Sequence, residues 1–130
     1  MKGYDEACDW WSVGVIMFEM LIGFPPFCSE TSQETYRKTI NWKHTLQFPE
    51  DCAISPEARD LIQRLCCDKS TRIKTLEEAK KHPFFKGLDW ENIRKTKNPP
   101  IIPKLKDKYD TSYFDKFEEE EEVERHQNVE

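Results

Sequence analysis

The sequence predicts an all-α fold followed by an extended, mostly irregular tail. Residues 8–24 form the most apolar stretch, and they are apolar on nearly every side of a helix. Helix-start signals recur after this stretch, whereas the apolar–polar alternation typical of strands is missing from the first 85 residues. After Phe85 the composition changes to Pro, Lys, Arg and finally Glu, which does not favour a second core.

The first helix, within residues 8–24, is expected to be buried nearly all round. Only Ser12 and Glu19 interrupt its apolar surface, and Gly23 ends it. Its two apolar faces carry Val13, Ile16, Met17, Met20 and Leu21 on one side and Val15, Phe18 and Ile22 on the other. Three further short helices make a thin shell for such a helix. We therefore expect that these residues are cut from a larger domain or borrow a partner chain.

Three more helices are predicted from their start signals. Thr31–Glu34 is a capping box that opens a helix to about Ile40, and Thr75–Glu78 is a second box whose helix ends before Pro83. Ser55–Pro56 places a capping hydroxyl before a proline at the first helical position. The helix after it should bury one stripe, composed of Ala58, Leu61, Ile62, Leu65 and Cys66.

The tail is divided by charge. Asp89 is expected to cap one more turn at residues 90–93, and residues 94–108 carry six bases against Asp107. Residues 118–130 hold seven acids against one Arg, so the net charge of -5 belongs to this segment. We expect this acidic end to be solvated and disordered from residue 118.

Composition excludes several classes of protein. The longest apolar run is too short for the ~20 residues of a membrane span, and the first residues do not resemble a signal peptide. The nearly neutral body argues against nucleic-acid binding. Five cysteines without a Cys-x-x-Cys pair, and only three histidines, predict no metal site. Reduced, buried thiols and a cytoplasmic or nuclear location are expected.

Several ordered motifs resemble one protein family. They are Asp9-Trp10-Trp11-Ser12-Val13-Gly14, Glu19-Met20, Gly23-Phe24-Pro25-Pro26-Phe27, Leu65 with Asp68 and Arg72, His82-Pro83-Phe84-Phe85, and Asp110 to Phe117. In this order the motifs resemble the C-lobe and C-terminal tail of AGC-class serine/threonine protein kinases, in particular the NDR/LATS branch. The resemblance implies a partial kinase domain over residues 1–85 and an AGC C-terminal tail over residues 86–130.

The resemblance also implies roles for five residues. The Asp9 carboxylate would accept hydrogen bonds from backbone N–H groups of the catalytic loop and so support that loop. The alternative is that Asp9 is an ordinary N-cap of its own helix. Arg72 would anchor the activation segment through the Glu of an Ala-Pro-Glu motif; otherwise it is a solvated surface Arg. Glu19 would face the substrate groove, or else solvent or an internal ion pair. Phe114 and Phe117 would reach the nucleotide pocket, or else dock on whatever apolar surface is near.

The sequence departs from the family where the chemistry is expected. A Gly-rich loop, a His-Arg-Asp catalytic loop, an Asp-Phe-Gly and an Ala-Pro-Glu are not found among the 130 residues. We therefore expect a truncated kinase without catalytic residues or activity of its own. The parent would use ATP and Mg²⁺, which this fragment is not expected to bind, and would act on proteins with basic residues near the phosphoacceptor. Its missing partner would be the kinase small lobe. The alternative is a non-catalytic protein-interaction module.

Overall fold

The computed structural model describes residues 5–95 and 99–116, and it divides the chain into two units, Met1–Trp90 and Glu91–Glu130. The described residues contain helices and turns but no strand, which confirms the predicted all-α class. The predictions for Phe117 and for the acidic segment 118–130 lie outside the described residues.

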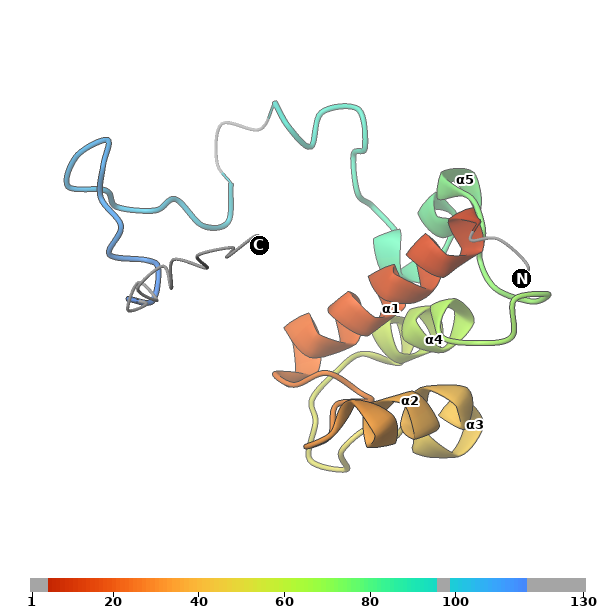
Figure 1. Ribbon diagram of the computed structural model, residues 1–130. Helices are drawn as coiled ribbons and strands as arrows, with labels where there is room; N and C mark the ends of the chain where they lie inside the picture. Colours follow the sequence, from red (N-terminus) through yellow and green to blue (C-terminus); the bar gives the residue numbers. More distant parts are fainter. Residues whose placement is uncertain (1–4, 96–98, 117–130) are drawn as a thin grey trace, which may run out of the picture. The chain divides into compact units, whose positions relative to one another are not determined.

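Helix α1, Glu6–Ile22, is the longest element (Figure 1). Asp5 caps it, because its side chain accepts a hydrogen bond from the Ala7 N–H at 3.2 Å. Gly23 ends it in the left-handed region, at φ 98°, and donates its N–H to the Glu19 carbonyl. The helix therefore begins earlier than the apolar run, and the alternative reading of Asp9 as its N-cap is wrong.

The other predicted helices are confirmed, with one short addition. They are α2 Ser32–Ile40, α4 Pro56–Leu65 and α5 Leu76–Lys80, capped by Thr31, Ser55 and Thr75 through bonds to the N–H three residues on. Two short elements were not predicted: α3, Trp42–Thr45, which has no side-chain cap, and the 3₁₀ turn Pro83–Phe85. Residues 90–95 form turns, with the Lys95 N–H bonded to the Asn92 carbonyl.

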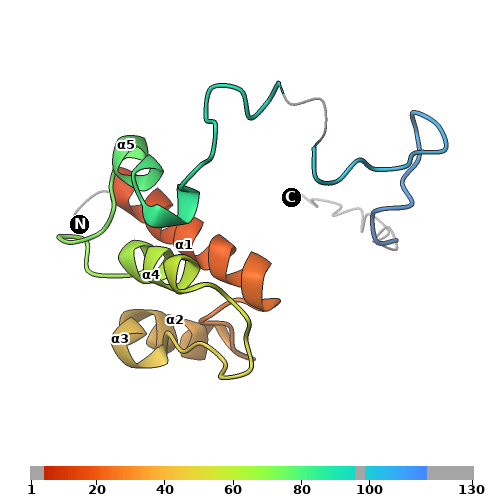
Figure 2. The same ribbon diagram turned by 180° about the vertical axis from the view of Figure 1, so that it is seen from behind.

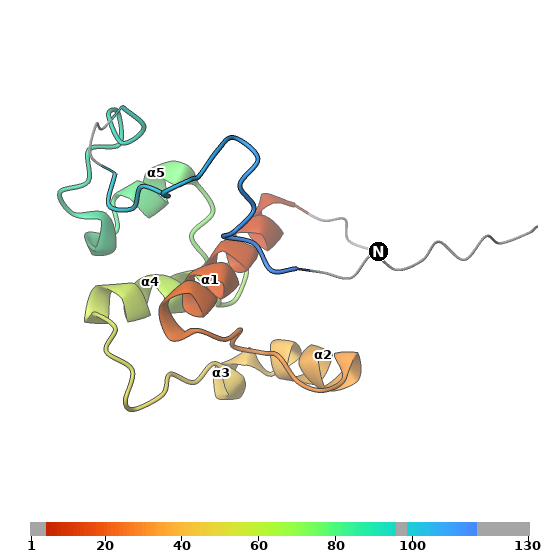
Figure 3. The ribbon, with the colours of Figure 1, turned by 90° about the vertical axis from the view of Figure 1, so that its left-hand side faces the viewer.

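The core of the first unit forms where α1 crosses α4. Seen from the front and from behind, the two helices lie side by side (Figures 1 and 2), and in Figure 3 α2 and α3 lie on one side of this pair and α5 on the other. The whole predicted stripe of α4 is buried. Gly14 lets the helices approach, because a Cβ there would lie 2.7 Å from both Cys66 Sγ and Leu65 Cβ.

The prediction that α1 is buried on all sides is wrong for this chain. Its inner face buries Ala7, Gly14 and Phe18, the last completely. The outer face stays open, with 46% of Val13, 55% of Ile16 and 81% of Met20 exposed. The physical reason is that the first unit packs on one side of α1, chiefly through α4, and leaves the other side of this helix largely uncovered within that unit.

The cysteines also differ from expectation. Only Cys66 is buried, while Cys8 and Cys28 are exposed and Cys52 and Cys67 lie in between, all five as free thiols. Burial raises the pKa of the Cys66 thiol to about 12, so this side chain packs as a small apolar group.

The described part of the second unit is a run of turns. Asp110 holds two of these turns together, because its carboxylate accepts hydrogen bonds from the N–H groups of Lys106 and Ser112, both at 2.9 Å. These backbone hydrogen bonds hold the pKa of Asp110 below its usual value. The Tyr113 hydroxyl accepts from the Lys104 N–H at 3.1 Å. Local polar contacts thus shape this unit, whose described side chains are almost all exposed.

Candidate functional site

Arg72 is the most highly connected of the predicted site residues. Its Nη1 donates to the Ala7 carbonyl at 2.6 Å, while Nη2 and Nε donate to the Cys67 carbonyl at 2.6 and 3.2 Å. The guanidinium carbon lies 4.9 Å from the centre of the Trp11 ring, which is a cation–π contact. Its acceptors among the described residues are carbonyl oxygens, so the predicted carboxylate partner stays a prediction, whereas the alternative of a solvated Arg does not describe this half-buried group.

A second contact ties the same loop to the start of α1. Lys69 forms an ion pair with Asp5, the N-cap of α1. This hydrogen bond to Lys69 is the main reason why the pKa of the Asp5 carboxyl is lowered. Arg72 bonds to the Ala7 carbonyl and Lys69 pairs with Asp5, so the loop after α4 holds the N-terminal end of α1 in place. Neither Asp5 nor Lys69 was identified from the sequence, since their pairing needs the crossing of α1 and α4.

Asp9 lies on the first turn of α1, one residue before the Trp10–Trp11 pair. Its side chain is exposed, and no described residue gives its carboxylate a hydrogen bond or an ion pair. The helix N-terminus favours its negative charge. The chain therefore presents a charged acceptor without a donor from the described residues, which leaves the predicted loop-supporting role as a prediction.

Glu19 also lies on the open side of α1. Its side chain is exposed beside Met20, and among the residues described it has no ion-pair partner. Of the two alternative readings, the solvent-facing one describes this chain and the internal ion pair does not. The Glu19 carboxylate is free to accept a cation, but the substrate-groove role stays a prediction.

Of the two predicted tail aromatics, Phe114 and Phe117, the structure describes only Phe114. Phe114 is 76% exposed, and its N–H bonds to the Thr111 carbonyl at 2.9 Å in a turn of the second unit. Phe117 is not among the described residues. Neither the nucleotide-pocket role nor the docked-aromatic alternative is tested for them.

Trp11 separates two hollows that sequence reasoning missed. A pocket of about 440 Å³ lies on one side of it, between α1, α3 and the loop after α4, and Arg72 closes part of that wall. A second pocket of about 440 Å³ lies on the other side and is lined mainly by apolar residues. Phe27 stacks on the Trp11 ring with centroids 5.6 Å apart, and Trp42 meets its edge at 6.2 Å. Phe27 is buried, so this ring has a structural role in the packing around Trp11.

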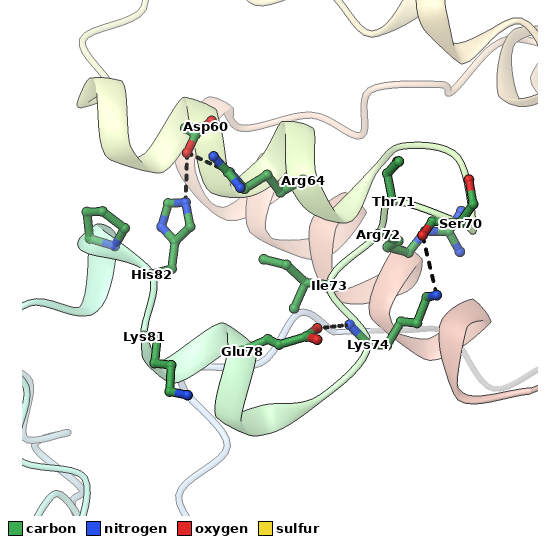
Figure 4. A pocket seen from close by; sticks show the side chains of 11 residues that line it. Asp60, Arg64, Ser70, Thr71, Arg72, Ile73, Lys74, Glu78, Lys81 and His82 are labelled. Atoms are coloured by element: carbon green, nitrogen blue, oxygen red, sulfur yellow. Dashed lines mark hydrogen bonds and ion pairs between the residues drawn. The ribbon is translucent and has the colours of Figure 1, made fainter.

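His82 lies at the start of the short turn that follows α5. It caps the 3₁₀ turn, accepting at Nδ1 from the Phe84 N–H at 3.2 Å, and its Nε2 lies 2.9 Å from Asp60 Oδ2 (Figure 4). With Nδ1 accepting, Nε2 carries the proton that Asp60 accepts. This buried histidine has both nitrogens occupied by structural contacts.

Neither a metal site nor a membrane span emerges from the described residues. Within residues 5–95 and 99–116 no three His, Cys, Asp or Glu side chains gather closely enough to hold an ion. No helix in the same ranges combines the length and the apolar character needed to cross a bilayer.

Comparison with known proteins identifies relatives across nearly the whole chain. The family described as "Protein kinase domain" matches residues 1–85. The chain is 54% identical to the probable serine/threonine-protein kinase ndrB of Dictyostelium discoideum over 98% of its own length and 24% of the relative's. It is also 54% identical to the serine/threonine-protein kinase CBK1 of Yarrowia lipolytica, over 87% of the chain and 20% of the relative. Identity to the serine/threonine-protein kinase sax-1 of Caenorhabditis elegans is 54% as well, over 92% of the chain and 26% of the relative. The chain thus spans about a quarter or less of the length of these relatives, whose names confirm the predicted NDR/LATS branch.

Proposed function

The chain belongs to the protein kinase family, and we propose that it is the helical second half of a kinase C-lobe with the first part of an AGC tail. In the whole enzyme, ATP with Mg²⁺ would supply the γ-phosphoryl group, and a Ser or Thr hydroxyl of a protein would accept it. The residues of this chain would scaffold that reaction. The chain alone would transfer no phosphoryl group.

The observation that carries this proposal is the open outer face of α1. Val13, Ile16, Met20 and Leu21 are all more than two-fifths exposed on one helix. An apolar surface of this kind is costly in water at about 25 cal/mol per Å², so it is expected to be covered in the active protein. The missing part of the lobe is the occupant that the family supplies.

Asp9 and Glu19 fit the same proposal, because both are exposed acids of α1 without an ion-pair partner among the described residues. We propose that Asp9 receives backbone N–H groups of the catalytic loop, and that Glu19 receives a basic residue of the substrate. Arg72, already placed by two carbonyls, would meet the Glu of the activation segment over the Trp11 ring. Phe114 and Phe117 would approach the nucleotide from the tail.

A chimera tests the proposal. Residues 1–116 replace the corresponding segment of ndrB from Dictyostelium discoideum, and we expect the hybrid to fold because the two sequences are 54% identical. We expect ATP-dependent phosphorylation of a Ser/Thr substrate by the chimera and none by the 130-residue chain. An inactive but folded chimera, or an active isolated chain, would overturn the proposal.

Two variants of the chimera separate the residue roles. Asp9→Ala should reduce kcat roughly 100-fold, because a displaced catalytic loop costs about that much. Glu19→Gln should leave kcat on a substrate without basic residues unchanged, but raise KM about fivefold for one that carries them. If Glu19→Gln affected both substrates equally, the substrate-groove role would be wrong.

The alternative, a non-catalytic interaction module, is favoured by one feature, the apolar pocket between Trp11, Val15 and Phe27. The chimera distinguishes it, since a module adapted to another partner would not restore phosphoryl transfer. A cytoplasmic or nuclear location is proposed for either function, and imaging of a tagged full-length protein would test it.

A further inference from the structure

Residues 99–103, in the described part of the second unit, have no role in the proposed function. Their sequence is Pro-Pro-Ile-Ile-Pro, with Pro100 and Pro103 three positions apart. All five side chains are exposed, Ile101 by 80% and Ile102 by 66%. The segment is not helical, and none of its backbone groups forms a hydrogen bond with another described residue. Its apolar side chains and its backbone carbonyls are therefore both available to a partner.

The three prolines restrict the backbone of this segment before any partner binds. Proline fixes φ at about −65°, and the residue before a proline is driven toward the extended or polyproline II region. Together these effects restrict four of the five residues, which are Pro99, Pro100, Ile102 and Pro103. Because little backbone freedom remains to be lost, binding in the polyproline II conformation costs less entropy here than in an ordinary loop.

The spacing of the prolines matches the period of that conformation. A polyproline II helix has about three residues per turn and rises about 3.1 Å per residue. In it, Pro100 and Pro103 would lie on the same edge, about 9 Å apart. Each is preceded by an apolar residue, Pro99 in one pair and Ile102 in the other. Two apolar–proline pairs one turn apart are the pattern that the aromatic-lined grooves of SH3 domains accept.

The chain directly after the segment is held by local contacts and carries positive charge. The Lys104 N–H donates to the Tyr113 hydroxyl at 3.1 Å, and the Lys106 N–H donates to Asp110 at 2.9 Å. Both lysine side chains are exposed, and no described carboxylate forms an ion pair with them. Two ammonium groups beside the prolines favour a partner with acidic residues next to its grooves.

We propose that residues 99–106 dock an SH3-type domain of a partner protein, one with acidic residues beside its two aromatic grooves. The pairs Pro99–Pro100 and Ile102–Pro103 would fill the grooves, and the two lysines would face the acids. An anionic membrane would also attract exposed lysines and isoleucines, but it does not read the spacing of prolines. That spacing, on a backbone already restricted to the matching helix, favours the protein partner. The proposal does not rest on phosphoryl transfer and goes beyond the proposed function.

The experiment measures binding of the 130-residue chain to an array of purified SH3 domains by fluorescence anisotropy at constant ionic strength. Phosphatidylserine vesicles are the second probe. We expect saturable binding to SH3 domains whose groove margins are acidic, and competition by a synthetic peptide of residues 99–108. A chain that binds no domain of the array, or that binds the vesicles alone, would overturn the proposal.

An exchange of two neighbouring residues is the sharpest variant. Ile102→Pro with Pro103→Ile keeps the composition, the charge and the number of prolines, but it shortens their spacing from three positions to two. Both side chains are exposed, so the folded part of the chain should not change. SH3 binding should weaken at least about tenfold, because one apolar–proline pair no longer meets its groove. Vesicle binding should stay within about twofold. Undiminished SH3 binding by this variant would refute the assignment.

Charge variants test the flanking lysines. Lys104→Glu with Lys106→Glu should weaken SH3 binding about fivefold, since two exposed ion pairs are lost. Lys81→Glu with Lys86→Glu makes the same change of charge at exposed positions of the first unit, and it should alter affinity less than about twofold. Equal losses in the two double variants would show that net charge rather than the segment controls binding, and would overturn the proposal.

Discussion

The close approach of α1 and α4 at Gly14 makes the sharpest prediction for stability. In Gly14→Ala the new Cβ would lie 2.7 Å from Cys66 Sγ and from Leu65 Cβ, which is closer than real Cβ contacts come. Because both neighbours are buried and Leu65 Cβ is fixed by its own helix, the chain must separate the two helices. Overpacking costs about 1–3 kcal/mol, while Ala gains about 1 kcal/mol over Gly in a helix.

The overpacking cost should lie at the upper end of this range, about 3 kcal/mol, because the new Cβ is too close to two atoms at once. After the gain of about 1 kcal/mol from Ala, the net loss of unfolding free energy should be about 2 kcal/mol. Far-UV circular dichroism during thermal and urea unfolding measures it, and the melting temperature should fall by roughly 10 °C. Ser12→Ala, an exposed change on the same helix, is the matched control and should stay within about 0.5 kcal/mol. Gly14→Ala with Cys66→Ala should recover part of the loss, because the sulfur contact disappears. A Gly14→Ala chain as stable as the original would refute the packing.

Three further perturbations test the contacts around α4. Arg72→Ala should lower the unfolding free energy by about 2–4 kcal/mol in urea titrations, and Arg72→Lys should recover little, since an ammonium cannot span both carbonyls; an unchanged urea midpoint would contradict this. The pKa of Asp60 is lowered, so its contribution to stability is present above the unfolded pKa near 3.8 and is lost as the pH falls through the lower folded value. Asp60→Asn should therefore flatten the loss of stability below about pH 4, and an identical acid limb in both proteins would count against the contact with His82. Iodoacetamide at pH 8 should label Cys8 readily and spare Cys66, whose pKa is about 12, as peptide mass spectrometry would show.

Local signals in the sequence predicted most of the helices correctly. Thr31, Ser55 and Thr75 each cap their helix as their hydroxyl chemistry requires, because a cap involves residues only three positions apart. The stripe of α4 was equally readable, since its 3.6-residue period has one buried face. The short helix α3 escaped prediction because it has no capping side chain and only four residues.

The site was harder to predict, because its contacts join segments far apart in the chain. Arg72 reaches Ala7 across 65 positions, and Lys69 reaches Asp5 in the same way, so no local pattern could indicate either pair. The resemblance to kinases singled out Arg72 and implied a carboxylate partner that the described residues do not contain, so the role as activation-segment anchor stays a prediction. Among the described residues the carbonyls of Ala7 and Cys67 accept its hydrogen bonds, because a half-buried guanidinium must satisfy its donors with the acceptors that lie near it.

The outer face of α1 connects these results. The apolar residues on every side of α1 predicted a central helix, but the sequence alone did not indicate which face of α1 the other helices of this chain would cover. Gly14 decides it, because the only residue of α1 without a side chain has to face the helix that comes closest, which is α4. Ile16 and Met20 then point away, on the same helix as the unpaired acids Asp9 and Glu19. Under the proposal that the chain is part of a kinase C-lobe, the packing partners of this apolar surface and the hydrogen-bond donors for Asp9 and Glu19 would come from outside the described residues.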